Sequence, residues 1–105
     1  MAQVVWSERA RDQLRVIVSY LAERVPLTAT EWADRLISAP DILEQLPEIG
    51  SPVEDAGVPD LRELLVGPYR IVYTIRGEEC HILIVFHAHR DIANVLFDDL
   101  WNPDD

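Results

Sequence analysis

Hydrophobic positions recur at helical spacing in the first part of the chain. From Ala10 to Leu21 apolar side chains return every three or four residues, and charged side chains fall between them, a spacing typical of an amphipathic helix. Ser7 is a preferred N-cap residue, and Glu8 places an acid in the first turn, where the helix dipole favours it. This pattern predicts a helix from Ser7 to about Arg24.

A second helical pattern follows a short break at residues 25–27, which include a proline. Thr28 or Thr30 can cap the new helix, and apolar residues then recur at helical spacing up to Leu46. Pro40 lies inside this run, where a proline removes a backbone hydrogen bond at a cost of about 3 kcal/mol. We therefore predict a helix hairpin whose second helix kinks or restarts at Pro40.

The second half of the chain reads as strands. A loop of about a dozen residues ends at Asp60, and β-rich segments follow at 61–66, 69–75 and 81–89. Gly67-Pro68 and Gly77-Glu78 separate them as short turns. With a short N-terminal strand, the order β-α-α-β-β-β predicts an α+β domain, in which the helix hairpin packs on one side of a largely antiparallel sheet.

Alternation along the strands assigns side chains to the two faces of this sheet. A two-residue loop at Gly77-Glu78 pairs Tyr73 with Ile82, Ile71 with Ile84 and Tyr69 with Phe86, which predicts an apolar face toward the helices. The opposite face then carries Arg70, Glu63, the three histidines and a group of apolar side chains: Leu65, Val72, Leu83 and Val85. The apolar group predicts that something covers this second face: the N-terminal strand, the acidic tail, a second copy or a partner protein.

Composition and charge narrow the function classes. The chain has 105 residues, 49% hydrophobic and 27% charged, which is typical of one globular domain. Nineteen acidic residues face nine basic ones, all arginine, for a net charge of −10. Because binding to nucleic acid requires clustered positive charge, we expect no direct sequence-specific nucleic-acid binding. Any anion site must be small, local and built from arginine.

The apolar runs and the two ends of the chain indicate the cellular compartment and the boundaries of the domain. No apolar run approaches the roughly 20 residues that span a bilayer, and the N-terminus lacks a secretory pattern. We therefore expect a cytoplasmic protein without membrane contact. The last residues turn acidic, so the sequence predicts one domain at 1–92 and an acidic C-terminal tail at 93–105.

Arginine, histidine and cysteine side chains are the candidates for a functional role. Arg70 either binds a phosphate or acidic group through its guanidinium fork or forms a cross-strand ion pair with Glu63. His87 and His89 are spaced as two metal ligands can be, but no defined third ligand or supporting shell is evident, so no metal and no other cofactor is predicted. Cys80 has no partner for a disulfide within the chain, and its acidic neighbours predict an unreactive thiol.

A set of motifs resembles the RelE/ParE superfamily of bacterial toxins over about residues 4–92. The most specific part is the run Gly67-Pro68-Tyr69-Arg70-Ile71-Val72-Tyr73, followed at hairpin distance by an apolar strand that ends in His87-Ala88-His89-Arg90-Asp91. Weaker support comes from Trp6-Ser7 with Ala10 and Leu14, Leu46-Pro47 with Gly50, and Leu61-Arg62-Glu63-Leu64. The resemblance implies a twisted antiparallel sheet with an N-terminal helix hairpin and a toxin that a small antitoxin wraps and inhibits.

The resemblance also implies a choice between two targets. RelE-like members cut messenger RNA on the ribosome with basic strand residues and a C-terminal tyrosine, whereas ParE-like members poison DNA gyrase. Here Glu63 and Leu65 fall near the basic positions, and Leu96 or Phe97 falls near the tyrosine. Because proton transfer by a positioned group contributes about 10²- to 10⁴-fold, this departure favours the ParE-like function without catalytic residues. A RelE-like nuclease and a non-toxic member that only binds its antitoxin are the alternatives.

The resemblance assigns candidate site residues as follows. Arg70, Arg90 and His87 are the candidates for target or phosphate binding, with a structural hydrogen bond as the alternative for His87. The candidates for the antitoxin interface are the apolar side chains of the second face: Leu65, Val72, Leu83 and Val85. Trp32, Leu36 and Leu43 belong either to the hairpin core or to an antitoxin groove. The net charge predicts a positively charged contact segment on the antitoxin.

Overall fold

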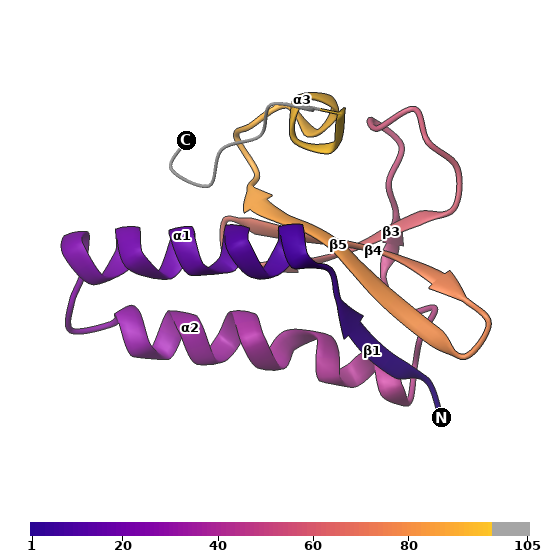
Figure 1. Ribbon diagram of the computed structural model, residues 1–105, viewed down its shortest axis with the longest axis horizontal. Helices are drawn as coiled ribbons and strands as arrows, with labels where there is room; N and C mark the ends of the chain where they lie inside the picture. The colour runs from indigo at the N-terminus through magenta and orange to yellow at the C-terminus, as the bar shows by residue number, and fades with distance from the viewer. Residues whose placement is uncertain (98–105) are drawn as a thin grey trace.

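The computed structural model describes residues 1–97, so residues 98–105 of the predicted tail lie outside the description. The order of elements is β1 (Gln3–Trp6), α1 (Glu8–Arg24), α2 (Ala29–Ser38), the 3₁₀ helix η1 (Ala39–Glu44), β2 (Ser51–Pro52), β3 (Leu61–Val66), β4 (Tyr69–Arg76), β5 (Glu79–His87) and α3 (Ile92–Phe97). Figure 1 shows α1 and α2 side by side under the sheet and α3 above it. The predicted α+β class and helix hairpin are confirmed.

Local sequence explains where the helices begin and break. The Ser7 side chain accepts a hydrogen bond from the Ala10 amide at 3.0 Å, which caps α1 as predicted. The second helical run does restart at Pro40, because α2 ends at Ser38 and Pro40 stands in the first turn of η1. A first-turn proline is tolerated, since that turn leaves its backbone N–H groups without helical acceptors.

The sheet has five strands in the order β1-β5-β4-β3-β2. β1 runs parallel to β5, and the other neighbours are antiparallel. One core lies between the sheet and the α1–α2 hairpin, with Leu36, Leu43, Ile71 and Tyr73 fully buried. A second core lies on the opposite face, where Val72, Ile84 and Phe86 meet side chains of the 53–60 loop and of α3.

A β-bulge in β5 corrects the predicted register. The pairing matches the prediction from Arg76 opposite Glu79 to Tyr73 opposite Ile82. Leu83 is then an extra residue, so that Val72 pairs with Ile84 and Ile71 with Val85. The predicted pairs of Ile71 with Ile84 and of Tyr69 with Phe86 are therefore wrong, because a one-residue shift reverses the face of every later side chain.

The start of α1 stabilises this bulge. The Ser7 hydroxyl donates to the Leu83 carbonyl at 2.9 Å, and the Val85 amide donates to Oε1 of Gln13 at 2.8 Å. At the bulge these two backbone groups do not take part in the regular hydrogen bonding between strands. A buried backbone N–H or C=O without a hydrogen-bond partner lowers the stability of the fold. Two polar side chains some 70 positions away thus make the register shift favourable.

Two segments of the chain itself cover the second face. The 53–60 loop contributes Val53 and Ala56, and α3 contributes Ile92 and Val95, all of them buried. Helix α3 starts at the predicted boundary of residue 92 and carries the packed structure into the segment assigned to the tail. No helix in the described part of the chain has the length and continuous apolar character needed to cross a membrane.

Candidate functional site

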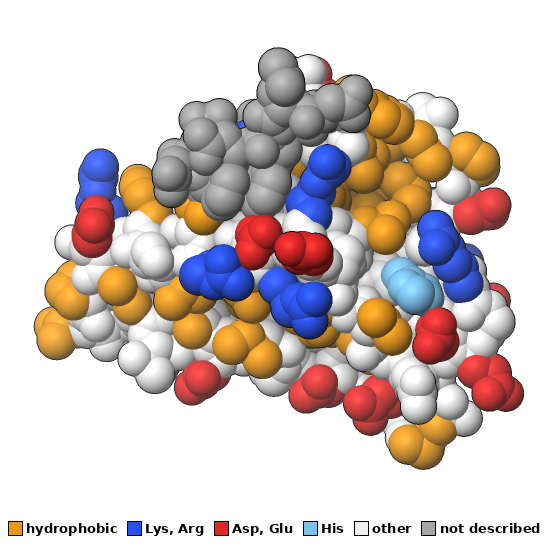
Figure 2. Space-filling view, in the orientation of Figure 1, with side chains coloured by type: hydrophobic (Ala, Val, Ile, Leu, Met, Phe, Trp, Pro, Cys, Tyr) orange, Lys and Arg blue, Asp and Glu red, His pale blue; other side chains and the backbone are white. Residues whose placement is uncertain are grey.

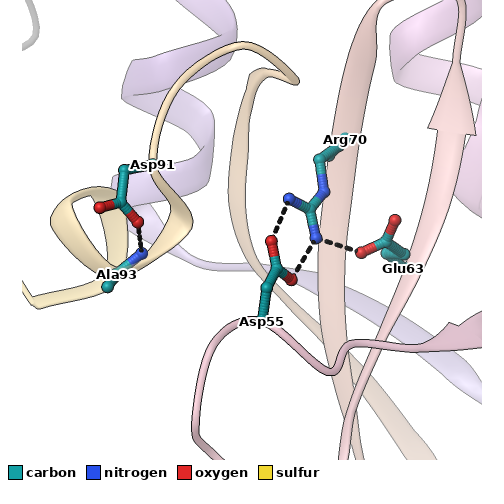
Figure 3. Close-up of polar contacts among 5 residues, drawn as sticks. All are labelled: Asp55, Glu63, Arg70, Asp91 and Ala93. Atoms are coloured by element: carbon teal, nitrogen blue, oxygen red, sulfur yellow. Dashed lines mark hydrogen bonds and ion pairs between the residues drawn. The ribbon is translucent and has the colours of Figure 1, made fainter.

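Arg70 stands at the centre of a polar cluster on the second face of the sheet. Its Nη1 donates to Oδ2 of Asp55 at 3.1 Å, and its Nη2 donates to Oδ1 of Asp55 at 3.0 Å and to Oε2 of Glu63 at 2.5 Å. Figure 3 shows the two carboxylates converging on the guanidinium from the 53–60 loop and from β3. The guanidinium carbon also lies 5.2 Å from the centre of the Phe86 ring.

Burial separates the roles of the two carboxylates. The side chains of Arg70 and Glu63 are only 12% and 14% exposed, whereas that of Asp55 is 60% exposed. The hydrogen bond from Arg70 lowers the pKa of the Asp55 carboxyl, and the Asp55 carboxylate in turn raises the pKa of Arg70. One positive and two negative charges leave this cluster with a net charge of −1.

Of the two sequence interpretations of Arg70, the structure contains the cross-strand pair with Glu63. The β3–β4 register places Glu63 opposite Val72, on the face that the two-residue Gly67-Pro68 turn predicts. Asp55 was not predicted to take part. The sequence shows it only as one acid in a loop without periodicity, and the path of that loop over the sheet brings it to Arg70.

His87 lies on the other face, toward the helices. It stands opposite Tyr69 in the register and packs edge-on against the Tyr69 ring, with centroids 5.5 Å apart. Nδ1 of His87 accepts a hydrogen bond from the His89 amide at 3.2 Å and faces Nδ1 of the His89 ring. Burial and the neighbouring His89 lower the pKa of His87, which favours its neutral form. The prediction that His87 shares a face with Arg70 is therefore wrong, because the bulge reverses its side.

The remaining candidate residues are dispersed. Arg90 follows β5 in a turn, is half-buried, and shows no side-chain hydrogen bond or ion pair with the residues the structure describes. Among the candidates for the antitoxin interface, Val72 is fully buried in the second core, and Val85 is buried on the helix side, contrary to its predicted face. Leu83 is partly buried and Leu65 is exposed.

The helix-side candidates and Cys80 belong to the core. Leu36 and Leu43 are fully buried there, and Trp32 packs against the same cluster and edge-on against Tyr69. Cys80 is buried, and burial rather than its acidic neighbours raises the pKa of the thiol. Among the described residues, no three His, Cys, Asp or Glu side chains are grouped as metal ligands.

The residues that the family resemblance places near the acid–base positions of a RelE-like nuclease have other surroundings in this structure. Glu63 is the counter-ion of Arg70, and Leu65 is exposed to solvent. Of the two residues near the tyrosine position, Leu96 packs at the edge of the second core and Phe97 is exposed. Arg9 donates to the carbonyls of Val95 and Leu96 and so holds the end of α3. The described surface around Arg70 therefore offers a neutralised cation rather than a set of proton donors and acceptors.

Comparison with known proteins identifies the family. A family model described as the ParE toxin of type II toxin–antitoxin systems, parDE, matches residues 4–92. Toxin RelE2 of Caulobacter vibrioides is 41% identical over 91 residues, which covers 86% of this chain and 99% of the relative. The Y4kP protein of Sinorhizobium fredii is 32% identical over 96 residues, which covers 90% of this chain and 96% of the relative.

A solved structure shares the fold. The structure described as the chromosomal ParDE toxin–antitoxin system from P. aeruginosa superposes with a TM-score of 0.71 at 21% identity, and the match covers 83% of this chain and 96% of the other. The family model spans nearly all of the described residues, including the helix hairpin, the bulged sheet and the Arg70 cluster. The chain therefore belongs to the ParE toxin family of type II toxin–antitoxin systems.

Proposed function

We propose that this chain inhibits bacterial growth by binding DNA gyrase, without a chemical step of its own, and that a cognate antitoxin neutralises it. The family supports the toxin role, and the Arg70 cluster supports the choice of target. Gyrase and antitoxin would both meet the chain in the cytoplasm.

The observation that carries this proposal is the neutralised state of Arg70. An RNA-cutting site needs a cation that is free to contact phosphate and a group that moves a proton. Arg70 instead donates three hydrogen bonds to two carboxylates. A phosphate at Arg70 would meet a local charge of −1 on a chain of net charge −10, which disfavours RNA at both short and long range.

A RelE-like nuclease is the second candidate, because the Caulobacter relative carries the name RelE2. In that case Asp55 would have to leave Arg70 before RNA could bind, and the proton transfers would have to come from groups other than Glu63, Leu65 and Leu96. These requirements make the nuclease the weaker proposal.

The proposed antitoxin contact includes fewer of the candidate residues than the sequence alone suggests. Leu65 and Leu83 are the accessible members of the predicted set, since Val72 and Val85 are buried by the chain's own core. We assign the antitoxin a contact that includes Leu65 and Leu83 and that carries positive charge toward this acidic chain.

The test uses the purified chain in two parallel assays. One incubates it with gyrase and supercoiled plasmid and measures trapped cleaved DNA, and the other adds it to translating ribosomes and maps cuts in the messenger. We expect trapped gyrase–DNA cleavage and intact messenger. Ribosome-dependent messenger cuts with normal gyrase activity would overturn the proposal, and inactivity in both assays would identify a non-toxic member.

A further inference from the structure

A pocket opens at the end of the sheet where β3 begins and β4 ends. Its volume is about 590 Å³, a size typical of ligand sites. Apolar walls come from the 53–60 loop and from β4, and include Val58, Pro59 and Ile75. Two arginines, Arg62 of β3 and Arg76 of β4, also line the pocket. It therefore combines apolar surface with cationic side chains.

The backbone of Ile75 is open toward this pocket. Arg76 pairs with Glu79 across the two-residue turn, so hydrogen-bonded pairs alternate back from Arg76 and the N–H and C=O of Ile75 face away from β5. On that side β3 begins only at Leu61, opposite Thr74. Ile75 has no backbone hydrogen bond on that side with the residues that the structure describes. One donor and one acceptor of β4 thus remain available to an extended chain.

Asp60 is the reason that β3 stops short of Ile75. Its φ of 66° lies in the left-handed region, which residues with a side chain adopt uncommonly, and turns the chain out of the strand. The Thr74 hydroxyl donates to the Asp60 carbonyl at 3.1 Å, so this carbonyl is directed to a side chain and does not pair with the Ile75 amide. Such backbone outliers cluster at binding sites.

The two arginines of the pocket keep their positive charge. Nη1 of Arg62 donates to the carbonyls of Glu48 and Gly50 at 3.0 and 2.8 Å, which are neutral acceptors. Arg76 is exposed and forms no ion pair with a described residue. Glu48 and Asp60 line the same pocket, so its side chains sum to zero charge within a chain of net charge −10. An anionic ligand therefore meets less repulsion here than the net charge suggests.

We propose that this pocket binds an extended segment of a partner protein in which an acidic side chain lies next to an aliphatic one. The backbone of the segment pairs with the N–H and C=O of Ile75, as in the addition of a strand to a sheet edge. Its carboxylate accepts hydrogen bonds from Arg76 and from Nη2 of Arg62. Its aliphatic side chain packs on Val58 and Pro59.

Charge distinguishes this partner from other occupants. The proposed antitoxin contact at Leu65 and Leu83 is basic, whereas this pocket takes an acidic segment, so the two surfaces are separate and the inference does not rest on the gyrase target. A nucleic acid fits poorly, because Glu48 and Asp60 repel each further phosphate. A second copy would bring together two molecules of net charge −10.

The probe is the acetylated and amidated peptide Leu-Asp-Val-Glu-Leu, and its control is Leu-Asn-Val-Gln-Leu, which has a similar shape and no charge. NMR titration of the whole chain locates the binding and measures the affinity at low and moderate salt. We expect amide shifts at residues 58–62 and 74–76, slower exchange of the Ile75 amide with solvent, and affinity that falls as salt rises. The control peptide should bind more weakly.

Two variants make the test specific. Arg76→Ala should weaken binding of the acidic peptide about 10-fold, the effect of losing a hydrogen bond to a charged group. The matched control Arg11→Ala changes the net charge equally, but on α1, where Figure 2 shows basic side chains among acidic ones, and should leave the affinity nearly unchanged. Circular dichroism of both variants confirms folding.

Three results would overturn the proposal. One is equal binding of the two peptides or equal weakening by the two substitutions, and another is amide shifts confined to other surfaces. The third is a shift of the amides of residues 98–105 caused by Arg76→Ala without peptide, because the chain's own acidic end would then be the occupant.

Discussion

The environment of Arg70 in the structure differs from the role that its sequence motif suggests. As a residue of the motif it is a candidate for anion binding, yet it lies 88% buried with its guanidinium over Phe86 and between two carboxylates. Glu63 is a nearly buried counter-ion on the adjacent strand, whereas Asp55 reaches in from an exposed loop. The first carboxylate neutralises Arg70, and the second ties the 53–60 loop to the sheet.

Replacing Asp55 by asparagine should loosen that loop with little loss of global stability. Since Asp55 is largely exposed, we expect a decrease of about 0.5–1 kcal/mol in the free energy of unfolding. Faster amide exchange should be confined to the loop and its ends. Hydrogen exchange followed by NMR measures the effect, with Glu54→Gln as the control because Glu54 is the exposed acid next to it. Equal exchange in both variants would contradict the assigned role.

The effect of Asp55 should depend on pH with a defined sign. Its pKa is lowered in the folded chain, so the unfolded chain binds the proton more tightly. The contribution to stability is therefore complete above the unfolded pKa of about 3.9 and is lost as pH falls through the lower folded value. Urea unfolding of wild type and Asp55→Asn should differ at pH 7, and the difference should shrink as pH falls through the lowered pKa of Asp55; a constant difference would count against the ion pair.

At the scale of elements, the bulge in β5 decides the composition of both cores. It places Val85 with the helices and turns Ile84 and Phe86 toward the 53–60 loop and α3. The backbone groups released by the bulge find their partners on α1, at Ser7 and Gln13. Helix α1 therefore sets the strand register as well as covering the sheet.

Replacing Gln13 by alanine should remove the acceptor of the Val85 amide and leave that buried N–H without a partner. We expect a loss of about 1–3 kcal/mol in the free energy of unfolding, measured by urea titration. Gln45→Ala is the matched control, because Gln45 is exposed and its side chain shows no described hydrogen bond. A loss of the same size at both positions would show that Gln13 does not support the bulge.

The two hairpin glycines differ in what surrounds them. Gly67 and Gly77 both have positive φ, at 56° and 60°, so alanine at either one costs about 1–2 kcal/mol in backbone strain. A Cβ at Gly67 would also enter the Trp32 ring, whereas nothing lies near Gly77. We therefore expect Gly67→Ala to be more destabilising than Gly77→Ala by about 1–3 kcal/mol in thermal or urea unfolding. Equal losses would mean that Trp32 moves aside freely.

At the scale of the whole molecule, the net charge of −10 acts on the fold and on its partners. Like charges repel within a compact chain, and salt screens this repulsion. Four of the nine arginines lie on α1, while residues 36–61 contain six acidic residues and no basic one. Repulsion among the excess acidic residues therefore opposes the compact state of the isolated chain.

Raising salt should consequently stabilise the isolated chain. We expect the melting temperature to increase by a few degrees, about 2–5 °C, between low and moderate sodium chloride, because screening of surface repulsion exceeds the weakening of the partly buried Arg70 pairs. Differential scanning calorimetry measures this directly. A melting temperature that falls with salt would show that ion pairs outweigh the net repulsion.

Local sequence explains most of the element boundaries, although β5 spans Glu79–His87 rather than the predicted 81–89, and the short strand β2 lies in the predicted loop. Ser7 as a cap, Pro40 as a restart and the glycine turns act within a few residues of themselves, so the pattern alone predicted the helix hairpin, the three consecutive strands and the first part of the β4–β5 register. The presence of α3 was not predicted, because its six residues form a helix only where the second core buries Ile92 and Val95.

The faces of β5 and the state of Arg70 were decided only by the tertiary structure. An extra residue in a strand is favourable when distant side chains bind the backbone groups it releases, and Ser7 and Gln13 lie about 70 positions from Leu83 and Val85. Likewise, Asp55 reaches Arg70 because its loop folds back over the sheet. Local patterns specify backbone conformation, whereas long-range hydrogen bonds and packing determine which side chains meet.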